Sequence, residues 1–320
     1  MFRLRFIPTE TDFKFMKGRF AGVAVSAFLS IASIILFFHP GLNYGIDFVG
    51  GIMVELRTQG PADTAGLRTG LTELGLGEIA LQEFGSASDV LIRIERQPGD
   101  DAAQMAAVTK VRGAMGTIAP GAELRRVEVV GPRVSAELFQ TGSMAVIFAL
   151  LAIMLYIWFR FEWQFGIGAV VTLVLDITKT VGLYAVTGME FNLTAIAAVL
   201  TILGYSVNDK VVVYDRMREN LRKYKAMPLR DLIDLSINQT LSRTIYTGLT
   251  VVLAMLPMAI AGGSAVQDFG ITMIFGVIVG TSSSIFISAP ILLFLGEGRL
   301  RRGMGDASTA APAPVARTKA

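Results

Sequence analysis

Residues 203–220 read LGYSVNDKVVVYDRMREN, and this stretch decides the fold because it carries charged and amide side chains into a long apolar run. A charged side chain near the middle of a bilayer helix costs about 2.5–3.5 kcal/mol on insertion scales. Such groups usually line an ion path or meet a partner of opposite charge. Asp209 is therefore the first candidate functional residue, with Asn208 and Lys210 as its polar neighbours.

The composition indicates a protein that crosses a membrane several times. Of the 320 residues, 52% are hydrophobic and only 17% are charged, whereas soluble domains are about one quarter charged. Cysteine is absent and His39 is the single histidine of the sequence. Disulfides, thiolate metal sites, Ser–His hydrolysis and histidine-based zinc chemistry are therefore disfavoured, and we expect neither a cofactor nor a metal site.

Six apolar runs are long enough to cross a bilayer as helices. They cover residues 20–38, 141–158, 166–187, 193–213, 244–261 and 269–295. The first run follows a basic segment, residues 1–19, and no small-x-small cleavage site follows it, so we expect a retained helix. Residues 140–297 then hold the second to sixth membrane helices, with a charged loop at 215–242 and a disordered tail, rich in Ala, Pro and Thr, at 298–320.

The distribution of lysine and arginine orients these helices. Basic residues gather in the segments that share a side with the N-terminus, whereas the short turns 188–190 and 262–267 on the other side hold none. The positive-inside rule therefore predicts that both termini are cytoplasmic and that residues 39–139 lie on the outer side.

The long external loop has the pattern of one small α+β domain. Alternating residues predict strands at 50–58, 78–84, 90–95 and 123–130, with a turn at 85–89 between the second and third. Helices are expected at 61–74 and from a cap at Asp100 or Asp101 to residue 118. The order β-α-β-β-α-β is that of the ferredoxin-like fold, which says little about function. No phosphate loop or aromatic nucleic-acid platform is present in the loop, so we expect mechanical or recognition work and no nucleic-acid partner.

Further charged residues lie inside or beside the apolar runs. Asp176 and Lys179 are three residues apart on one helical face, so local neutralisation and a role in ion transfer are equally open. Arg243 opens the fifth run. It is either an ordinary positive-inside anchor or a cation that reaches Asp209 from a neighbouring helix and forms a gated ion pair.

Small residues recur every four positions in the sixth run, at Gly276, Gly280, Ser284 and Ser288. Such a ridge lets another helix approach closely, and packing is a sufficient explanation for it.

Four blocks of the sequence resemble the signature blocks of the SecF family of protein-export membrane subunits. They are GIDFVGG at 45–51, VGPRVSAEL at 130–138, the stretch 204–220 and GTSSSIFISAP at 280–290. The blocks follow the order of the family, and the resemblance covers about residues 20–297.

The resemblance implies a polytopic α-helical membrane protein whose six transmembrane helices form half of an RND-type bundle, with a ferredoxin-like periplasmic domain at 39–139. It implies a bacterial inner-membrane location and no enzymatic activity. The partners that it implies are SecD, the SecYEG channel with SecA, an unfolded preprotein, and YajC and YidC. The function that it implies is use of the proton motive force, together with SecD, to promote preprotein export.

The family's proton-relay acid and arginine correspond to Asp209 and Arg243, and Asn208 and Asp176 occupy other polar positions of its motifs. Two positions depart from the family. Lys210 stands where many relatives carry a small polar residue, and Leu175 where a histidine is common. Helical geometry allows Lys210 to reach toward the cytoplasmic interface while Asp209 faces the bundle.

Three alternative functions share parts of this pattern. A scaffold subunit of the translocase would need the same partners but no proton coupling. A small-molecule exporter of the RND type would normally need larger external domains. An intramembrane aspartyl protease could use Asp176 and Asp209, but its Gly-x-Gly-Asp signature occurs at 303–306, in the polar tail.

Overall fold

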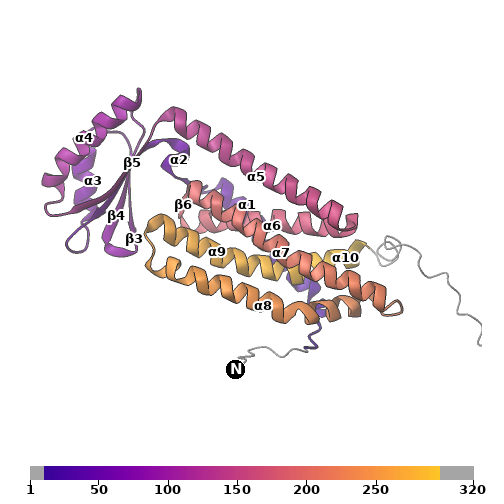
Figure 1. The fold of residues 1–320 in the computed structure, drawn as a ribbon. Coiled ribbons are helices and arrows are strands. Elements are labelled where there is room, and N and C mark those ends of the chain that lie inside the picture. The colour runs from indigo at the N-terminus through magenta and orange to yellow at the C-terminus, as the bar shows by residue number, and fades with distance from the viewer. Residues whose placement is uncertain (1–10, 296–320) are drawn as a thin grey trace, which may run out of the picture.

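The computed structural model describes residues 11–295, and it shows a long helical bundle with an α+β domain at one end (Figure 1). Within this part of the chain, six helical segments are long and apolar enough to span a bilayer. They are α1 (Arg19–Phe38), α5 (Pro132–Arg160), α6 (Trp163–Thr187), α7 (Leu193–Lys223), α8 (Leu229–Ala261), and α9 (Ser264–Ser283) continued by the π-helix η2 (Ser284–Ser288) and α10 (Ala289–Leu295). The chain is therefore a multi-pass membrane protein, as predicted. The predicted tail at 298–320 and the first ten residues lie outside the described part.

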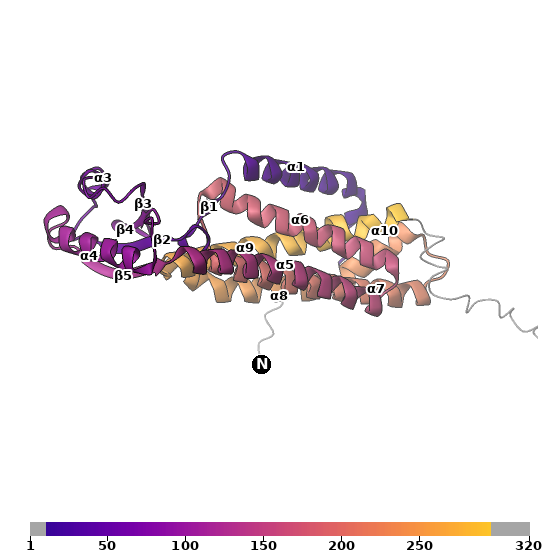
Figure 2. The same ribbon diagram turned by 90° about the horizontal axis from the view of Figure 1, so that it is seen from above.

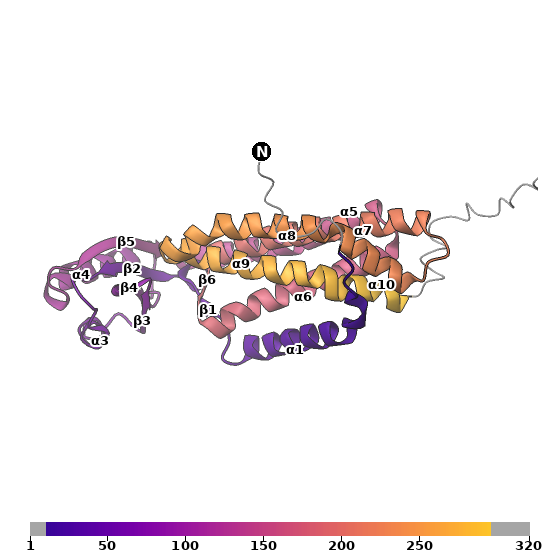
Figure 3. The same cartoon turned by 90° about the horizontal axis from the view of Figure 1, so that it is seen from below.

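The helices differ in how much of each lies inside the bundle. α1 lies at one edge, beside α6 (Figure 2, Figure 3). In the apolar windows of α7 and of the sixth span, 56% of the residues are buried, against 11% for α5 and α8. With 50% of its window buried, α6 also belongs to the interior, which is thus built around α6, α7 and α9, whereas α5 and α8 present wide apolar faces outward.

Three helices, α5, α7 and α8, extend by nine residues or more beyond the apolar runs that predict them. α5 begins nine residues earlier, with Pro132 at its first turn, where proline is well tolerated. The predicted loop 215–242 is helical except for residues 224–228, because α7 continues to Lys223 and α8 begins at Leu229. Apolar side chains such as Met217 and Ile233 are buried there, and Nδ2 of Asn220 donates a 2.9 Å hydrogen bond to Oγ of Ser236. The many charged residues of this segment led to the prediction of a loop, although its apolar residues form a packed helical face.

The external domain has the predicted β-α-β-β-α-β order. Its four strands, β2 (Gly51–Arg57), β3 (Ile79–Phe84), β4 (Ser86–Ile94) and β5 (Glu123–Val130), form an antiparallel sheet in the order β3-β4-β2-β5. Helices α3 (Thr64–Thr72) and α4 (Asp101–Ile118) contribute Leu67, Leu71 and Val111 to a core with the inward residues of the sheet. The β3–β4 turn is shorter than predicted, because Gly85 adopts a φ of 67° and β4 starts at Ser86.

A short connector joins this domain to the bundle. β1 (Asn43–Tyr44) pairs in parallel with β6 (Glu190–Phe191), which directly precedes α7. The one-turn helix α2 (Ile46–Val49) follows, and Oδ2 of Asp47 accepts a 2.9 Å hydrogen bond from the backbone N–H of Leu193. That bond satisfies one of the free amides at the start of α7. The domain is therefore tied to the outer end of α7 by backbone and side-chain bonds.

The turn between α2 and β2 requires two glycines. Gly50 and Gly51 have φ values of 75° and 124°, which residues with a side chain rarely adopt. A Cβ atom at Gly51 would also overlap the carbonyl oxygen of Ile94 on the neighbouring strand. This pair of residues sets the direction in which the sheet leaves the connector.

An ion pair between a buried carboxylate and a partly exposed arginine stabilises the external sheet. The side chain of Asp89 is 6% exposed, and its carboxylate accepts hydrogen bonds of 2.6 and 2.7 Å from Nε and Nη2 of Arg57. Ser86 donates a third bond of 2.8 Å. Chiefly because of the Arg57 bonds, the pKa of Asp89 falls to about 2.

We expect Asp89→Asn to destabilise the external domain by about 1–2 kcal/mol at pH 7, since a charge-assisted, partly exposed pair is lost. Because the folded-state pKa lies below the unfolded value, the pair stabilises the fold above about pH 4, and this contribution disappears as the pH falls toward 2. Urea unfolding of the full chain is followed by pulsed hydrogen exchange of the amides in β2 and β4. The midpoint at pH 7 measures the loss of stability in Asp89→Asn, and the midpoint at pH 3 shows how far that difference shrinks. Asp63→Asn is the control, because asparagine can keep the cap that Asp63 provides to α3. Equal midpoints for Asp89→Asn and the wild type at pH 7 would contradict the expectation.

Candidate functional site

Asp209 lies inside the bundle, in the middle of α7. It is 6% exposed, and its Oδ1 accepts a 2.7 Å hydrogen bond from Oγ1 of Thr244 on α8. Its Oδ2 is buried and has no hydrogen-bond partner among the described residues. One oxygen of this carboxylate is therefore held by a neutral hydroxyl, and the other is unsatisfied.

The predicted ion pair between Asp209 and Arg243 is not formed in this structure. Arg243 is exposed, and its guanidinium acts on the carboxylate only through longer-range electrostatics. Neighbouring residues of a helix point about 100° apart, so when Thr244 faces α7, Arg243 faces outward. Asn208, a predicted supporting residue, is likewise on an exposed face.

A close, buried ion pair joins Asp176 of α6 to Lys210 of α7. Nζ of Lys210 is 3.0 Å from Oδ2 of Asp176, and the two side chains are 0% and 1% exposed. Lys210 therefore does not take the path toward the cytoplasmic interface that its place on the helix would also allow. Helical rotation turns it into the bundle, where an acid partner offsets the cost of burying its charge.

Two serines complete the environment of this pair. Ser206, one turn before Lys210, and Ser283 of α9 each donate a 2.8 Å hydrogen bond to Oδ2 of Asp176. The same hydroxyls accept from Nζ of Lys210, at 2.5 and 3.1 Å. Sequence reasoning missed both serines, although Ser206 lies four residues before Lys210 and thus on the same helical face.

Lys179 makes a looser contact on the other side of Asp176. Its Nζ is 3.7 Å from Oδ1 of Asp176, an oxygen that has no hydrogen-bond partner among the described residues. Of the two alternatives that the sequence left open, local neutralisation within α6 is thus present but weak, because the closer cation comes from α7.

The small residues of the sixth span let α9 approach α7 closely. A Cβ atom at Gly276 would overlap the side chain of Ile202, and one at Gly280 would lie 3.2 Å from Oγ of Ser206. Ser284 is buried and donates a 3.0 Å hydrogen bond to the carbonyl of Gly280. This close approach brings Ser283 within reach of the charged pair.

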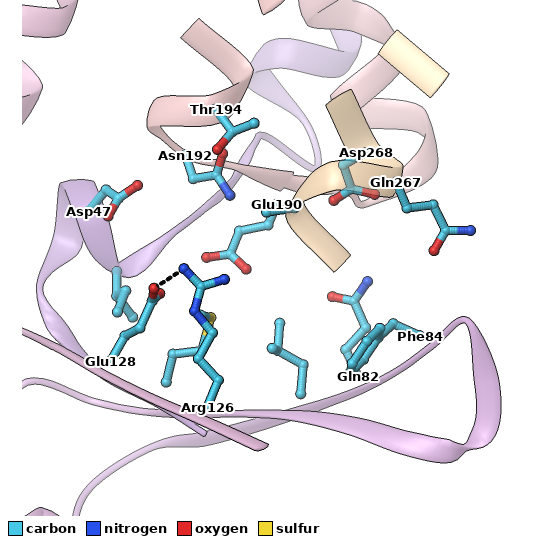
Figure 4. A pocket seen from close by; sticks show the side chains of 14 residues that line it. Asp47, Gln82, Phe84, Arg126, Glu128, Glu190, Asn192, Thr194, Gln267 and Asp268 are labelled. Atoms are coloured by element: carbon cyan, nitrogen blue, oxygen red, sulfur yellow. Dashed lines mark ion pairs between the residues drawn. The ribbon is translucent and has the colours of Figure 1, made fainter. Parts of the chain in front are cut away.

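A second cluster of charges lies where the external domain meets the bundle (Figure 4). A cavity of about 220 Å³ is lined by Asp47 of α2, Arg126 and Glu128 of β5, Glu190 of β6 and Asp268 of α9, among others. Arg126 and Glu128 form an ion pair. The side chain of Glu190 points into the space above them (Figure 4), and burial raises its pKa. The junction therefore has an excess of carboxylates.

We expect Glu190→Gln to raise the thermal unfolding midpoint by a few degrees at pH 8, because the buried carboxylate opposes folding while it is charged. The folded-state pKa of Glu190 lies above the unfolded value, so its cost grows as the pH rises between these two values and is absent at lower pH. The difference between variant and wild type should thus shrink at pH 4. Glu128→Gln serves as the control, since Glu128 has Arg126 as a partner and its loss should bring no gain. An unchanged or lower midpoint for Glu190→Gln at pH 8 would count against this reading.

The chain is similar to known protein export membrane proteins along most of its length. The family model described as protein export membrane protein SecD/SecF, C-terminal, matches residues 110–298, and the SecD/SecF GG motif matches residues 35–62. Curated relatives include the protein translocase subunit SecF of Rickettsia bellii, 44% identical over 303 residues, with 94% of this chain and 99% of the relative covered. That of Rhodobacter capsulatus is 44% identical over 310 residues, with 93% of each chain covered.

Two solved structures are also similar. The crystal structure of SecDF, a translocon-associated membrane protein from Thermus thermophilus, superposes with a TM-score of 0.82 at 34% identity. It covers 90% of this chain, which spans 39% of the solved one. SecDF in a super-membrane-facing form gives a TM-score of 0.66 at 33% identity, with 94% and 40% covered. At nearly equal identity, the two solved chains thus differ in how closely their arrangement matches this one.

Proposed function

Since this chain belongs to the SecD/SecF family of protein export membrane proteins, we propose that it acts as the SecF subunit of the Sec protein translocase and uses the proton motive force, with SecD, to promote preprotein export. The observation that carries the proton-coupled part is Asp209. It is a buried carboxylate in a membrane-spanning helix, without an ion pair among the described residues and with one oxygen unsatisfied. Such a group has little to lose on protonation.

The proposed cycle begins with a proton that reaches Asp209 from the periplasmic side. Protonation removes the negative charge that attracts Arg243 and turns one carboxylate oxygen into a donor, which changes the bond with Thr244. α7 and α8 then repack, and release of the proton to the cytoplasm restores the first arrangement. Movement of one charge across the membrane supplies about 2.3 kcal/mol per 100 mV, enough to bias two conformations.

The connector offers a route from Asp209 to the external domain. α7 carries Asp209, and its first residue, Leu193, is bonded to Asp47 directly before the sheet. β1 and β6 add a second link at the same end. Repacking of α7 therefore moves the connector, and we propose that the domain, at about residues 39–139, moves against an emerging, unfolded preprotein. The different match to the two solved SecDF forms fits a family whose parts rearrange.

Family membership and the exposed helices also suggest the partners and the location. The wide apolar faces of α5 and α8 suit either lipid or the other half of an RND-type bundle, and we propose SecD as the main occupant. The SecYEG channel with SecA, and YajC and YidC, follow as further partners from the resemblance to SecF. We propose a bacterial inner-membrane location with both termini cytoplasmic.

Asp209→Asn should leave assembly intact but remove the part of preprotein transport that depends on the proton motive force. Asparagine keeps the size and an acceptor for Thr244, yet it does not carry a proton. Translocation assays in membrane vesicles, with and without an uncoupler, measure this component. Asp215→Asn is the matched control on the same helix, because Asp215 is half-exposed and pairs with Arg160. If this chain is instead a scaffold without proton coupling of its own, Asp209→Asn should keep the full transport activity of the wild type, including the part that the uncoupler removes.

SecD should copurify with this chain after gentle detergent extraction, since six helices alone leave α5 and α8 largely uncovered. Pull-down of the tagged chain followed by mass spectrometry tests this. Recovery of a stable lone chain that restores export by itself would contradict the expected complex.

A further inference from the structure

Two buried carboxylates face the interior helices of this bundle, and their surroundings differ sharply. Asp176 is in contact with two cations, Lys210 at 3.0 Å and Lys179 at 3.7 Å. Asp209 forms no ion pair among the described residues, and the side chains that act directly on its carboxylate are two neutral hydroxyls, Thr244, which donates a 2.7 Å hydrogen bond, and Ser284. The two acids therefore respond differently to a proton.

The ammonium group of Lys210 has a full set of partners. Its three N–H donors meet three acceptors, Oδ2 of Asp176, Oγ of Ser206 and Oγ of Ser283. These come from α6, from α7 itself and from α9. Removal of the charge on either Asp176 or Lys210 would leave the other group buried and uncompensated, which is far more costly than breaking an exposed pair.

Protonation of Asp176 is opposed from both sides. Its Oδ2 already accepts from Lys210 and from the two serines, and its Oδ1 faces the ammonium of Lys179. A neutral Asp176 would leave two buried cations near one another. Asp209 has the opposite setting, because Lys210 is directed at Asp176 and Arg243 is exposed, so both act on Asp209 only at longer range.

We infer that Lys210 commits Asp176 to a permanent ion pair, so that of these two carboxylates Asp209 alone exchanges protons. Lys210 is thus a positioning residue: it fixes α6, α7 and α9 to one another and limits the chain to a single titrating acid among the two. If the proposed function holds, this means that one proton, and not two, is loaded on these helices in each cycle. The protonation assignment itself does not depend on export activity.

Infrared difference spectroscopy tests this on the full chain in lipid bilayers, together with SecD where it copurifies. A buried carboxylic acid has a carbonyl stretch that appears on protonation, so the spectrum is followed as the pH is changed. We expect a titrating band in the wild type that is lost in Asp209→Asn and retained in Asp176→Asn, where the freed charge of Lys210 shifts the pH of its midpoint but does not remove it. Loss of this band in Asp176→Asn would overturn the inference, and this comparison stands even if lysine variants fail to fold.

Two lysine variants give the matched comparison. Lys210→Met should add a second titrating band, and the double variant Asp176→Asn with Lys210→Met should lack it. Lys179→Met, the same chemical change on the looser side of Asp176, should add none. A second band in Lys179→Met but not in Lys210→Met would overturn the assignment of Lys210. If the bands behave as expected while Asp209→Asn still exports normally with the proton motive force, the coupling proposal fails and the protonation assignment remains.

Discussion

Charge buried away from water is the constraint on which the membrane part of this structure depends, because each ion in an apolar bundle needs a partner inside that bundle. Asp176 and Lys210 meet this requirement across α6 and α7, and Ser206 and Ser283 complete it. The arrangement needs close helix packing: only small residues at Gly276 and Gly280 let α9 bring Ser283 near the pair. Asp209, less than one helical turn from this network, forms no ion pair among the described residues and interacts with the neutral hydroxyls of Thr244 and Ser284, so the proposed proton carrier differs from the Asp176–Lys210 pair in having no cation in contact with it.

Much of the architecture can be predicted from the sequence, because a bilayer imposes a minimum length on apolar helices and because apolar and polar residues alternate in the strands of the external loop. Strand β5 lies at the residues predicted for it, and Asp100 caps α4 as one of the two residues expected there. The ends of the helices are less predictable. A hydropathy criterion ends each helix where charged residues begin. However, α7 continues to Lys223 and α8 starts at Leu229, because one face of each helix still carries buried apolar residues within these charged segments.

The site is predictable only in part. Helical periodicity and the cost of burial place Asp209 inside the bundle, and they make Asp176 and Lys179 neighbours. They do not give the rotation of α6 and α9 about their axes, and this rotation decides that Lys210 meets Asp176. The same uncertainty of rotation made Arg243, instead of Thr244, the expected neighbour of Asp209. The rotation of each helix is set by the packing of all the helices together, so it cannot be read from the residues around one position.

The bond between Asp47 and the first amide of α7 gives the protein a mechanical property. Asp209 lies 16 residues beyond Leu193, so roughly 24 Å of rigid helix separates it from the connector, at 1.5 Å per residue. In the proposed cycle, α7 acts as a lever arm: a tilt of about 5° around Asp209 would displace its outer end by roughly 2 Å over that length. Because the glycine turn at Gly50–Gly51 follows directly, such a small displacement of the connector would, in the proposed cycle, reorient the whole external sheet.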